Sequence, residues 1–151
     1  MLTIVIVEDS EEDFSAIQRV FRRASTDVQL VWYRDGEEVM KALANVGRRM
    51  FTGHDTPGML LLDLNLPGID GREILARIKR DAFLKSVPVV IFSTSSSPKD
   101  IAFCYEQGAN GYMVKPMSFT QFEKKLLLFI EYWTQAMVLP PDRGVPVNVG
   151  A

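Results

Sequence analysis

The sequence is poor in the residues that mark several large classes of protein. It has one cysteine, so no disulfide can form within the chain, and a reducing compartment is its natural setting. No apolar run is long enough to cross a bilayer, and the apolar start lacks the basic residues of a signal peptide. The net charge of −2 provides no general basic surface for nucleic acid. We therefore expect a cytoplasmic protein that binds neither membranes nor nucleic acid.

Histidine is equally scarce. His54, the single one, lies among glycine, threonine and aspartate in the segment 47–58, a composition typical of a loop. We interpret His54 as a solvated loop residue rather than a metal ligand or a phosphorelay histidine. With no histidine predicted nearby, Cys104 is interpreted as a small packing residue and not as a nucleophile.

A regular alternation of strand-like and helix-like segments organises the rest of the chain. Apolar runs predict buried strands at 3–7, 28–33, 59–63, 89–93 and 111–114. Apolar residues at helical spacing follow each strand, and the last helix should run from about residue 118 to the late 130s. This alternation predicts one α/β domain, a parallel sheet with helices on both faces. We place it at 1–139, ahead of a Pro/Gly-rich tail at 140–151.

Polar residues follow four of the five predicted strands. Glu8 and Asp9 come after the first, Asp63 ends the third, Ser93 ends the fourth and Lys115 follows the fifth. Taken singly, each could be a cap, a turn residue or a solvated charge. Because the carboxyl ends of parallel strands lie along one edge of a sheet, the five side chains should converge there. Their joint placement favours a functional site.

The chemistry of this set is that of phosphoryl transfer. Clustered carboxylates repel one another and call for a counter-charge. Their hard oxygens suit Mg²⁺, which keeps water and phosphate oxygens as its other ligands. A carboxylate beside Mg²⁺, a lysine and a hydroxyl is equipped to accept a phosphoryl group. The sequence therefore predicts a magnesium-dependent phosphoryl acceptor.

The same motifs resemble the receiver domain of two-component response regulators, over residues 2 to about 135. They are the acid pair, Asp63 before a Pro-Gly turn, the hydroxyl and the Lys115-Pro116 pair. Ser93 and Lys115 lie 30 and 52 residues after Asp63, separations that resemble those of single-domain chemotaxis regulators. The resemblance implies a flavodoxin-like (βα)5 doubly wound sheet with strand order 2-1-3-4-5.

The resemblance also implies roles for the acidic residues and their neighbours. Asp63 matches the phosphoacceptor, Asp9 a direct Mg²⁺ ligand and Glu8 an acid that works through a water. Asp63 and the backbone carbonyl of Asn65 complete the implied metal site. Asn65 and Ser95 match the two positions that tune dephosphorylation, and neither supplies an acid to activate water.

Residues after the fourth and fifth strands have implied roles in binding and switching. Ser93 matches the hydroxyl that binds the phosphoryl group and moves on activation, and Lys115 the lysine that pairs with that group. Tyr112 matches the aromatic switch that turns inward when the hydroxyl moves. The bond between Lys115 and Pro116 is expected to be cis, as in the family.

No output domain is recognisable after the receiver, so the signal should leave through a surface. Family receivers use the face made by the fourth helix, fifth strand and fifth helix, and here that face is rich in apolar residues. In the fourth helix we expect Ile101 and Tyr105 to face inward and Phe103 outward. Several apolar residues on one face favour an interface, most simply a two-fold homodimer. The predicted interface residues are Phe103, Phe122, Phe129, Tyr132 and Trp133.

The long last helix and its Tyr132-Trp133 pair resemble one subgroup, the stand-alone regulators paired with phytochrome-type sensor kinases in bacteria. That subgroup implies a sensor histidine kinase as partner and phosphoryl donor. A receiver of this kind would catalyse only its own phosphorylation and dephosphorylation.

Two other functions are weighed against this one. A haloacid-dehalogenase-type phosphatase also forms an aspartyl-phosphate, but it places a second acid two residues after the nucleophile, where this chain has Asn65. A scaffold that works without phosphorylation would need none of the acids, the hydroxyl or the lysine, and here the set is complete.

Overall fold

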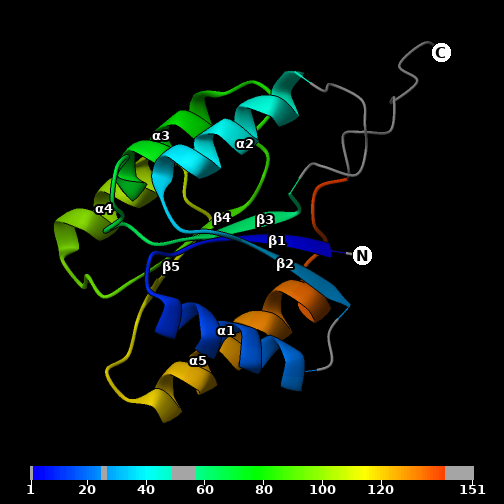
Figure 1. The fold of residues 1–151 in the computed structure, drawn as a ribbon, viewed down its shortest axis with the longest axis vertical. Coiled ribbons are helices and arrows are strands. Elements are labelled where there is room, and N and C mark those ends of the chain that lie inside the picture. Colours follow the sequence, from blue (N-terminus) through cyan, green and yellow to red (C-terminus); the bar gives the residue numbers. More distant parts are fainter. Residues whose placement is uncertain (1, 25–26, 49–56, 142–151) are drawn as a thin grey trace.

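The computed structural model describes residues 2–24, 27–48 and 57–141 of the chain. This part contains five parallel strands: β1 (Leu2–Val7), β2 (Val28–Tyr33), β3 (Met59–Leu62), β4 (Val89–Ser93) and β5 (Gly111–Val114). They pair in the order β2-β1-β3-β4-β5 (Figure 1). The predicted flavodoxin-like fold and strand order are confirmed.

Helices cover both faces of the sheet. They are α1 (Glu11–Arg23), α2 (Gly36–Arg48), α3 (Gly71–Arg80), α4 (Pro98–Glu106) and α5 (Phe119–Glu131). Figure 1 shows α1 and α5 together on one face and α2, α3 and α4 on the other. Among the described residues, none of these helices combines the length and the apolar character needed to cross a bilayer.

The last α-helix ends earlier than its apolar pattern predicts. After Glu131 the chain continues as a π-helical turn, Tyr132–Ala136, closed by a hydrogen bond of 3.0 Å from the Met137 N–H to the Tyr132 carbonyl. The Thr134 hydroxyl donates to the Ile130 carbonyl at 2.6 Å. Such back-bonding competes with the regular helical ladder.

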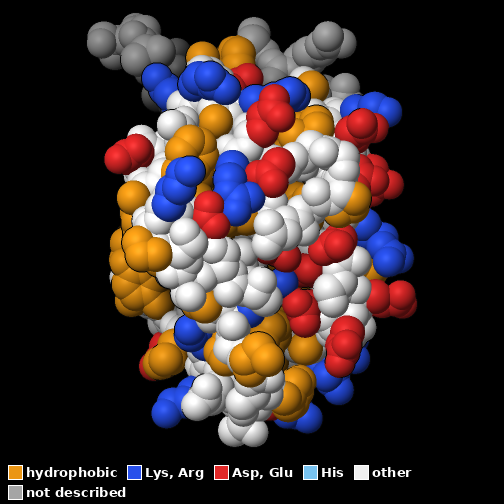
Figure 2. Space-filling model, turned by 90° about the vertical axis from the view of Figure 1, so that its left-hand side faces the viewer, with side chains coloured by type: hydrophobic (Ala, Val, Ile, Leu, Met, Phe, Trp, Pro, Cys, Tyr) orange, Lys and Arg blue, Asp and Glu red, His pale blue; other side chains and the backbone are white. Residues whose placement is uncertain are grey.

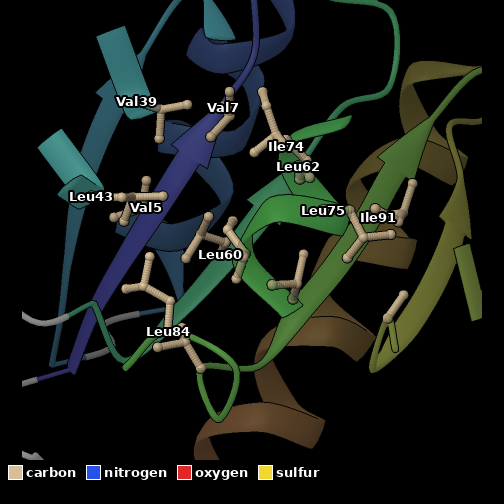
Figure 3. Close-up of a cluster of buried hydrophobic side chains, with 14 of the residues drawn as sticks. Val5, Val7, Val39, Leu43, Leu60, Leu62, Ile74, Leu75, Leu84 and Ile91 are labelled. Carbon is tan, nitrogen blue, oxygen red and sulfur yellow. The ribbon is translucent and has the colours of Figure 1, made fainter. Parts of the chain in front are cut away.

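The alternation of side chains along the strands divides the core into two clusters. Val5, Val7, Leu60 and Leu62 point toward α2 and α3, the cluster drawn in Figure 3. Their neighbours in the strands point the opposite way, toward α1 and α5. Because β1, β3 and β4 are buried on both faces, they consist almost entirely of apolar residues.

Two predictions about the α4 and α5 surface are wrong. Tyr105 is exposed, whereas Phe103 packs against the cluster beside α2 and α3, the opposite of what was predicted for these two side chains; Ile101 is partly buried. The buried Cys104 sets the phase of this helix. Phe122 and Phe129 are buried in the cluster beside α1 and α5 and cannot form an exposed interface.

Several predictions fall on residues outside the described part. His54 lies there, with most of its loop and residues 142–151 of the tail. The domain boundary at residue 139 therefore stays a prediction.

We predict that Leu60→Ala lowers the free energy of unfolding by about 2–5 kcal/mol, because it opens a cavity between β3 and the helices α2 and α3. Urea denaturation measures the loss. The control is Met117→Ala, at a fully exposed side chain, which should change stability by less than about 0.5 kcal/mol. Equal effects of the two changes would contradict this assignment of the core.

Candidate functional site

The carboxyl ends of the strands meet at the left-hand edge of the molecule in Figure 1. Figure 2 looks onto this edge and shows acidic side chains gathered across the middle and right of the face. Within the described part of the chain, the buried polar or charged side chains are Glu8, Asp63, Ser93 and Lys115. Burying such groups is costly unless they are paired. All four are residues that the sequence analysis assigned to the site.

Lys115 is the centre of the site. Its Nζ atom donates to Glu8 Oε2 at 2.5 Å, to Asp13 Oδ2 at 2.8 Å and to Asp63 Oδ2 at 2.9 Å. An ammonium group has three N–H donors, and each of them has a carboxylate partner here. The lysine that follows β5 therefore joins acids that come from β1, α1 and β3.

Asp13 is a site residue that the sequence analysis missed. It is one of three acids, with Glu11 and Glu12, in the first turn of α1. Its spacing carried a signal, because Asp13 lies three, four and seven residues before Ala16, Ile17 and Val20, which are all buried. The neighbouring Glu11 and Glu12 are exposed, and spacing alone does not separate Glu12 from Asp13, because Glu12 lies four residues before the buried Ala16.

Asp63 is held from both sides. Its Oδ1 accepts a hydrogen bond of 2.7 Å from the Leu64 N–H, while its Oδ2 is bound by Lys115. The start of α3 packs against its backbone: a Cβ atom on Gly71 would lie 2.1 Å from the Asp63 carbonyl oxygen. Gly68 has a φ of +74°, the left-handed conformation that the predicted Pro-Gly turn requires. The turn thus places the start of α3 against the backbone of Asp63.

Three carboxylates of this edge could hold a divalent cation. Oxygens of Glu8, Asp9 and Asp63 all lie within 4.8 Å of one another. Glu8 is also fixed by a hydrogen bond of 3.0 Å from the Ser10 N–H to its Oε1. Hard oxygen ligands at this spacing fit Mg²⁺ or Mn²⁺. A role for the Asn65 carbonyl in this site stays a prediction.

Burial and the neighbouring charges shift the pKa values of Glu8 and Lys115. Burial raises the pKa of Glu8 to about 7, with Lys115 opposing the shift and Asp63 adding to it. Burial alone would lower the pKa of Lys115, but the surrounding acids outweigh it and raise that pKa above its ordinary value. The lysine therefore stays charged, while Glu8 takes up a proton near neutral pH.

Ser93 and the loop after it connect this site to β5 and α4. The Ser95 N–H donates to Ser93 Oγ at 3.2 Å, and the Tyr112 hydroxyl donates to the Ser95 carbonyl at 2.8 Å. The Ser95 hydroxyl donates to Asp100 Oδ2 at 2.6 Å. The predicted switch residues Ser93 and Tyr112 therefore contact the same residue, Ser95.

Arg72 extends this network to α3, a connection with no signal in the sequence pattern. Its Nε and Nη2 atoms donate to the two carboxylate oxygens of Asp100 at 3.0 and 2.9 Å. Its Nη1 also donates to Asp70, the N-cap residue of α3, at 3.1 Å. The hydrogen bonds from Arg72 and Ser95 lower the pKa of Asp100. A bidentate pair between residues 28 positions apart follows no helical or strand period, so only the tertiary fold reveals it.

The peptide bond between Lys115 and Pro116 is trans, and the expectation of a cis bond is wrong: the described residues contain no cis peptide bond. Lys115 nevertheless points into the site. Its backbone N–H donates to the Ser93 carbonyl at 2.7 Å, which extends the pairing of β4 with β5 by one residue. The three carboxylates then fix its side chain.

We predict that the metal-free protein loses stability as the pH rises from about 5 to 8. The pKa of Glu8 in the folded state is about 7, above its ordinary value of 4.5, so its contribution is complete below pH 4.5 and is lost as the pH rises through 7. The loss should reach at most about 3 kcal/mol. Urea unfolding in EDTA at several pH values measures it.

Glu8→Gln should flatten this pH profile, because the amide does not titrate. Glu12→Gln, an exposed change in the first turn of α1, should leave the slope as it is. An unchanged slope in the Glu8 variant would contradict the assignment to Glu8.

Known proteins share both this sequence pattern and this fold. The profile of the response regulator receiver domain matches residues 4–127. The response regulator Rcp1 of Synechocystis is 36% identical over 137 residues, which are 91% of this chain and 92% of Rcp1. The probable methanogenesis regulatory protein FilR2 of Methanothrix harundinacea is 37% identical over 130 residues, 86% of this chain and 82% of that protein.

Solved structures of response regulators have the same fold as this chain. The crystal structure of the Mn²⁺-bound form of Rcp1 superposes with a TM-score of 0.86 at 35% identity, covering 93% of this chain and 100% of Rcp1. The phosphorylated cyanobacterial phytochrome response regulator RcpA gives a TM-score of 0.84 at 36% identity, covering 93% and 99% of the two chains. The predicted resemblance to receivers, and to phytochrome-associated regulators among them, is confirmed. This chain belongs to the response regulator receiver domain family.

Proposed function

We propose that this chain is a stand-alone response regulator that accepts a phosphoryl group from a sensor histidine kinase on Asp63, with Mg²⁺ bound. The observation that carries the proposal is the buried cluster at the carboxyl edge of the sheet. There, Lys115 Nζ lies 2.9 Å from Asp63 Oδ2, and oxygens of Glu8 and Asp9 lie within 4.8 Å of an Asp63 oxygen. This set has the nucleophile, the counter-charge and the metal ligands that the transfer requires.

The transfer forms one bond and breaks one bond. A carboxylate oxygen of Asp63 attacks the phosphorus of a phosphohistidine, the new O–P bond forms and the P–N bond to the imidazole breaks. Lys115 neutralises charge on the transferred oxygens, and the Ser93 hydroxyl donates to one of them. Mg²⁺, held by Glu8, Asp9, Asp63 and the Asn65 carbonyl, would supply further positive charge when bound.

Phosphorylation would shift an existing equilibrium between two conformations of the β4–α4 loop. Ser93 would move toward the phosphoryl group, and Ser95 would follow because its N–H is bonded to Ser93 Oγ. Tyr112 would respond because its hydroxyl is bonded to the Ser95 carbonyl. Asn65 and Ser95 stand at the positions that would tune the lifetime of the aspartyl-phosphate.

The kinase partner would be of the phytochrome type. The likeness to Rcp1 and to RcpA, a phytochrome response regulator, supports this, since each likeness covers nearly the whole of those chains.

A cytoplasmic location fits the single cysteine, Cys104, whose buried thiol has a pKa raised by burial to about 11.

We predict that acetyl phosphate with Mg²⁺ adds one phosphoryl group to the protein and that Asp63→Asn abolishes the addition, because the amide is not a nucleophile. Intact mass spectrometry measures the adduct. The control, Asp27→Asn, removes an acid at the opposite end of the sheet and should leave the adduct unchanged. If hydrolysis is too fast, metal-dependent binding of beryllofluoride to the wild type replaces the mass shift.

The same preparation tests the two rival functions. A wild type that gains no mass and binds no beryllofluoride would leave the receiver fold as a scaffold. Steady turnover of p-nitrophenyl phosphate would favour the phosphatase, although Asn65 stands where that enzyme class has its second acid.

We further propose that the output is altered dimerisation or partner docking through α4, β5 and α5. Of the predicted interface residues, Tyr132 is exposed at the end of α5, and Trp133 is partly buried behind it. Leu127 and Leu128 are also exposed on this helix. Removing exposed apolar side chains from water lowers the free energy, which favours an interface here. A two-fold homodimer is the simplest arrangement.

We predict that Leu128→Glu weakens self-association, because it buries a charge in the proposed interface. Leu128 is 60% exposed, so the monomer itself should keep its stability. Sedimentation velocity with and without beryllofluoride measures the dimer fraction. Phe83→Glu is the matched control, since Phe83 is 45% exposed in the segment between α3 and β4. Equal dimer fractions in both variants would contradict the α5 interface.

A further inference from the structure

The contacts of Lys115 leave none of its N–H groups free for a phosphoryl oxygen. Glu8, Asp13 and Asp63 each accept one of its three hydrogen bonds, at 2.5, 2.8 and 2.9 Å. Any phosphoryl oxygen that Lys115 binds must therefore replace one of these carboxylates.

The three carboxylates differ in what their release would cost. The side chains of Glu8 and Asp63 are 3% and 9% exposed, whereas that of Asp13 is 32% exposed. A buried carboxylate that loses its partner bears the full cost of its lost hydration, and a partly exposed one is hydrated instead. Asp13 also lines an open cavity of about 170 Å³ between α1 and the β5–α5 loop, which gives water access to it. Asp13 is therefore the partner that Lys115 can leave most easily.

Helix α1 holds Asp13 in place for this role. The Ser10 side chain caps the helix by accepting a hydrogen bond of 3.1 Å from the Asp13 N–H. The buried Ile17 and Val20 anchor the same face of α1 against the sheet. The backbone of Asp13 is therefore anchored by its cap and by the buried face of α1.

We infer that Asp13 is a positioning residue that competes with the phosphoryl group for Lys115, an inference that rests on the function proposed above. In the unphosphorylated protein, Asp13 holds the ammonium at the outer side of the site. When Asp63 carries a phosphoryl group, one N–H of Lys115 passes from Asp13 to a phosphoryl oxygen, and water hydrates the Asp13 carboxylate. The proton stays on the lysine throughout, so this exchange neither makes nor breaks a covalent bond.

The test is the affinity for beryllofluoride in the presence of Mg²⁺, measured by isothermal titration calorimetry. We expect Asp13→Asn to bind about two- to fivefold more tightly than the wild type, because the competing charge is gone. Damage to the fold would weaken binding, so the direction of the change separates competition from a structural role. Asp13→Glu should return the affinity toward that of the wild type.

A matched control removes the general effect of charge. Glu12→Gln removes the same charge from the adjacent residue, which is exposed and has no side-chain partner in the described part of the chain. Its affinity should stay near that of the wild type. In a Lys115→Ala background, Asp13→Asn should no longer tighten binding. Tightening that is equal in the Glu12 and Asp13 variants, or that persists without the lysine, would overturn the inference.

A second measurement needs no phosphoryl analogue. Thermal unfolding of the wild type, Asp13→Asn, Lys115→Ala and the double variant forms a cycle that reports the Asp13–Lys115 contact in the free protein. We expect the two single changes to be non-additive, and additive changes would overturn the contact itself.

A wild type that unfolds as expected but binds no beryllofluoride would overturn the proposed function, and the competition with it. A wild type that binds while Asp13→Asn shows no tightening would overturn only the role of Asp13.

Discussion

The ion cluster around Lys115 is the interaction on which the rest of the site depends. Three carboxylates lie within hydrogen-bond distance of one ammonium at an edge of the sheet where two of them, Glu8 and Asp63, are buried. Without the lysine these acids would repel one another with little water to screen them. Because Lys115 follows the edge strand β5 and Glu8 follows β1, the cluster forms only when β3 and β4 are inserted between those two strands.

From this cluster, contacts spread into three helices. Asp13 leads into α1, and Ser93 leads through Ser95 to Asp100 at the start of α4. Arg72 joins that residue to α3. Asp63 is joined to Lys115 and, through the same ammonium, to Asp13 of α1, and the backbone N–H of Lys115 joins that lysine to the Ser93 carbonyl. In a shift between two conformations, each of these hydrogen bonds would be either kept or exchanged for another.

The apolar residues of α5 illustrate how one helix serves both the core and the surface. Phe122 packs at 5.1 Å from Phe92 of β4, and Phe129 packs at 6.5 Å from Phe21 of α1, both measured between ring centroids. Leu128 and Tyr132 lie on the other side of the same helix and remain exposed. The sequence could not divide these apolar residues into buried and exposed ones, because that division needs the phase of the helix relative to the sheet.

The sequence by itself determined the fold class and the main members of the site. Apolar runs and helical spacing fixed the alternation of strands and helices, and the carboxyl-edge rule for parallel sheets brought Glu8, Asp63, Ser93 and Lys115 together. Only the tertiary structure decided which further groups meet them. Asp13 reaches Lys115 across 102 residues and Arg72 reaches Asp100 across 28, and such contacts depend on crossover geometry rather than on any local period. The same reason explains the misplaced Phe103 and Tyr105 of α4, since a short helix with one buried residue takes its orientation from the surface it packs on.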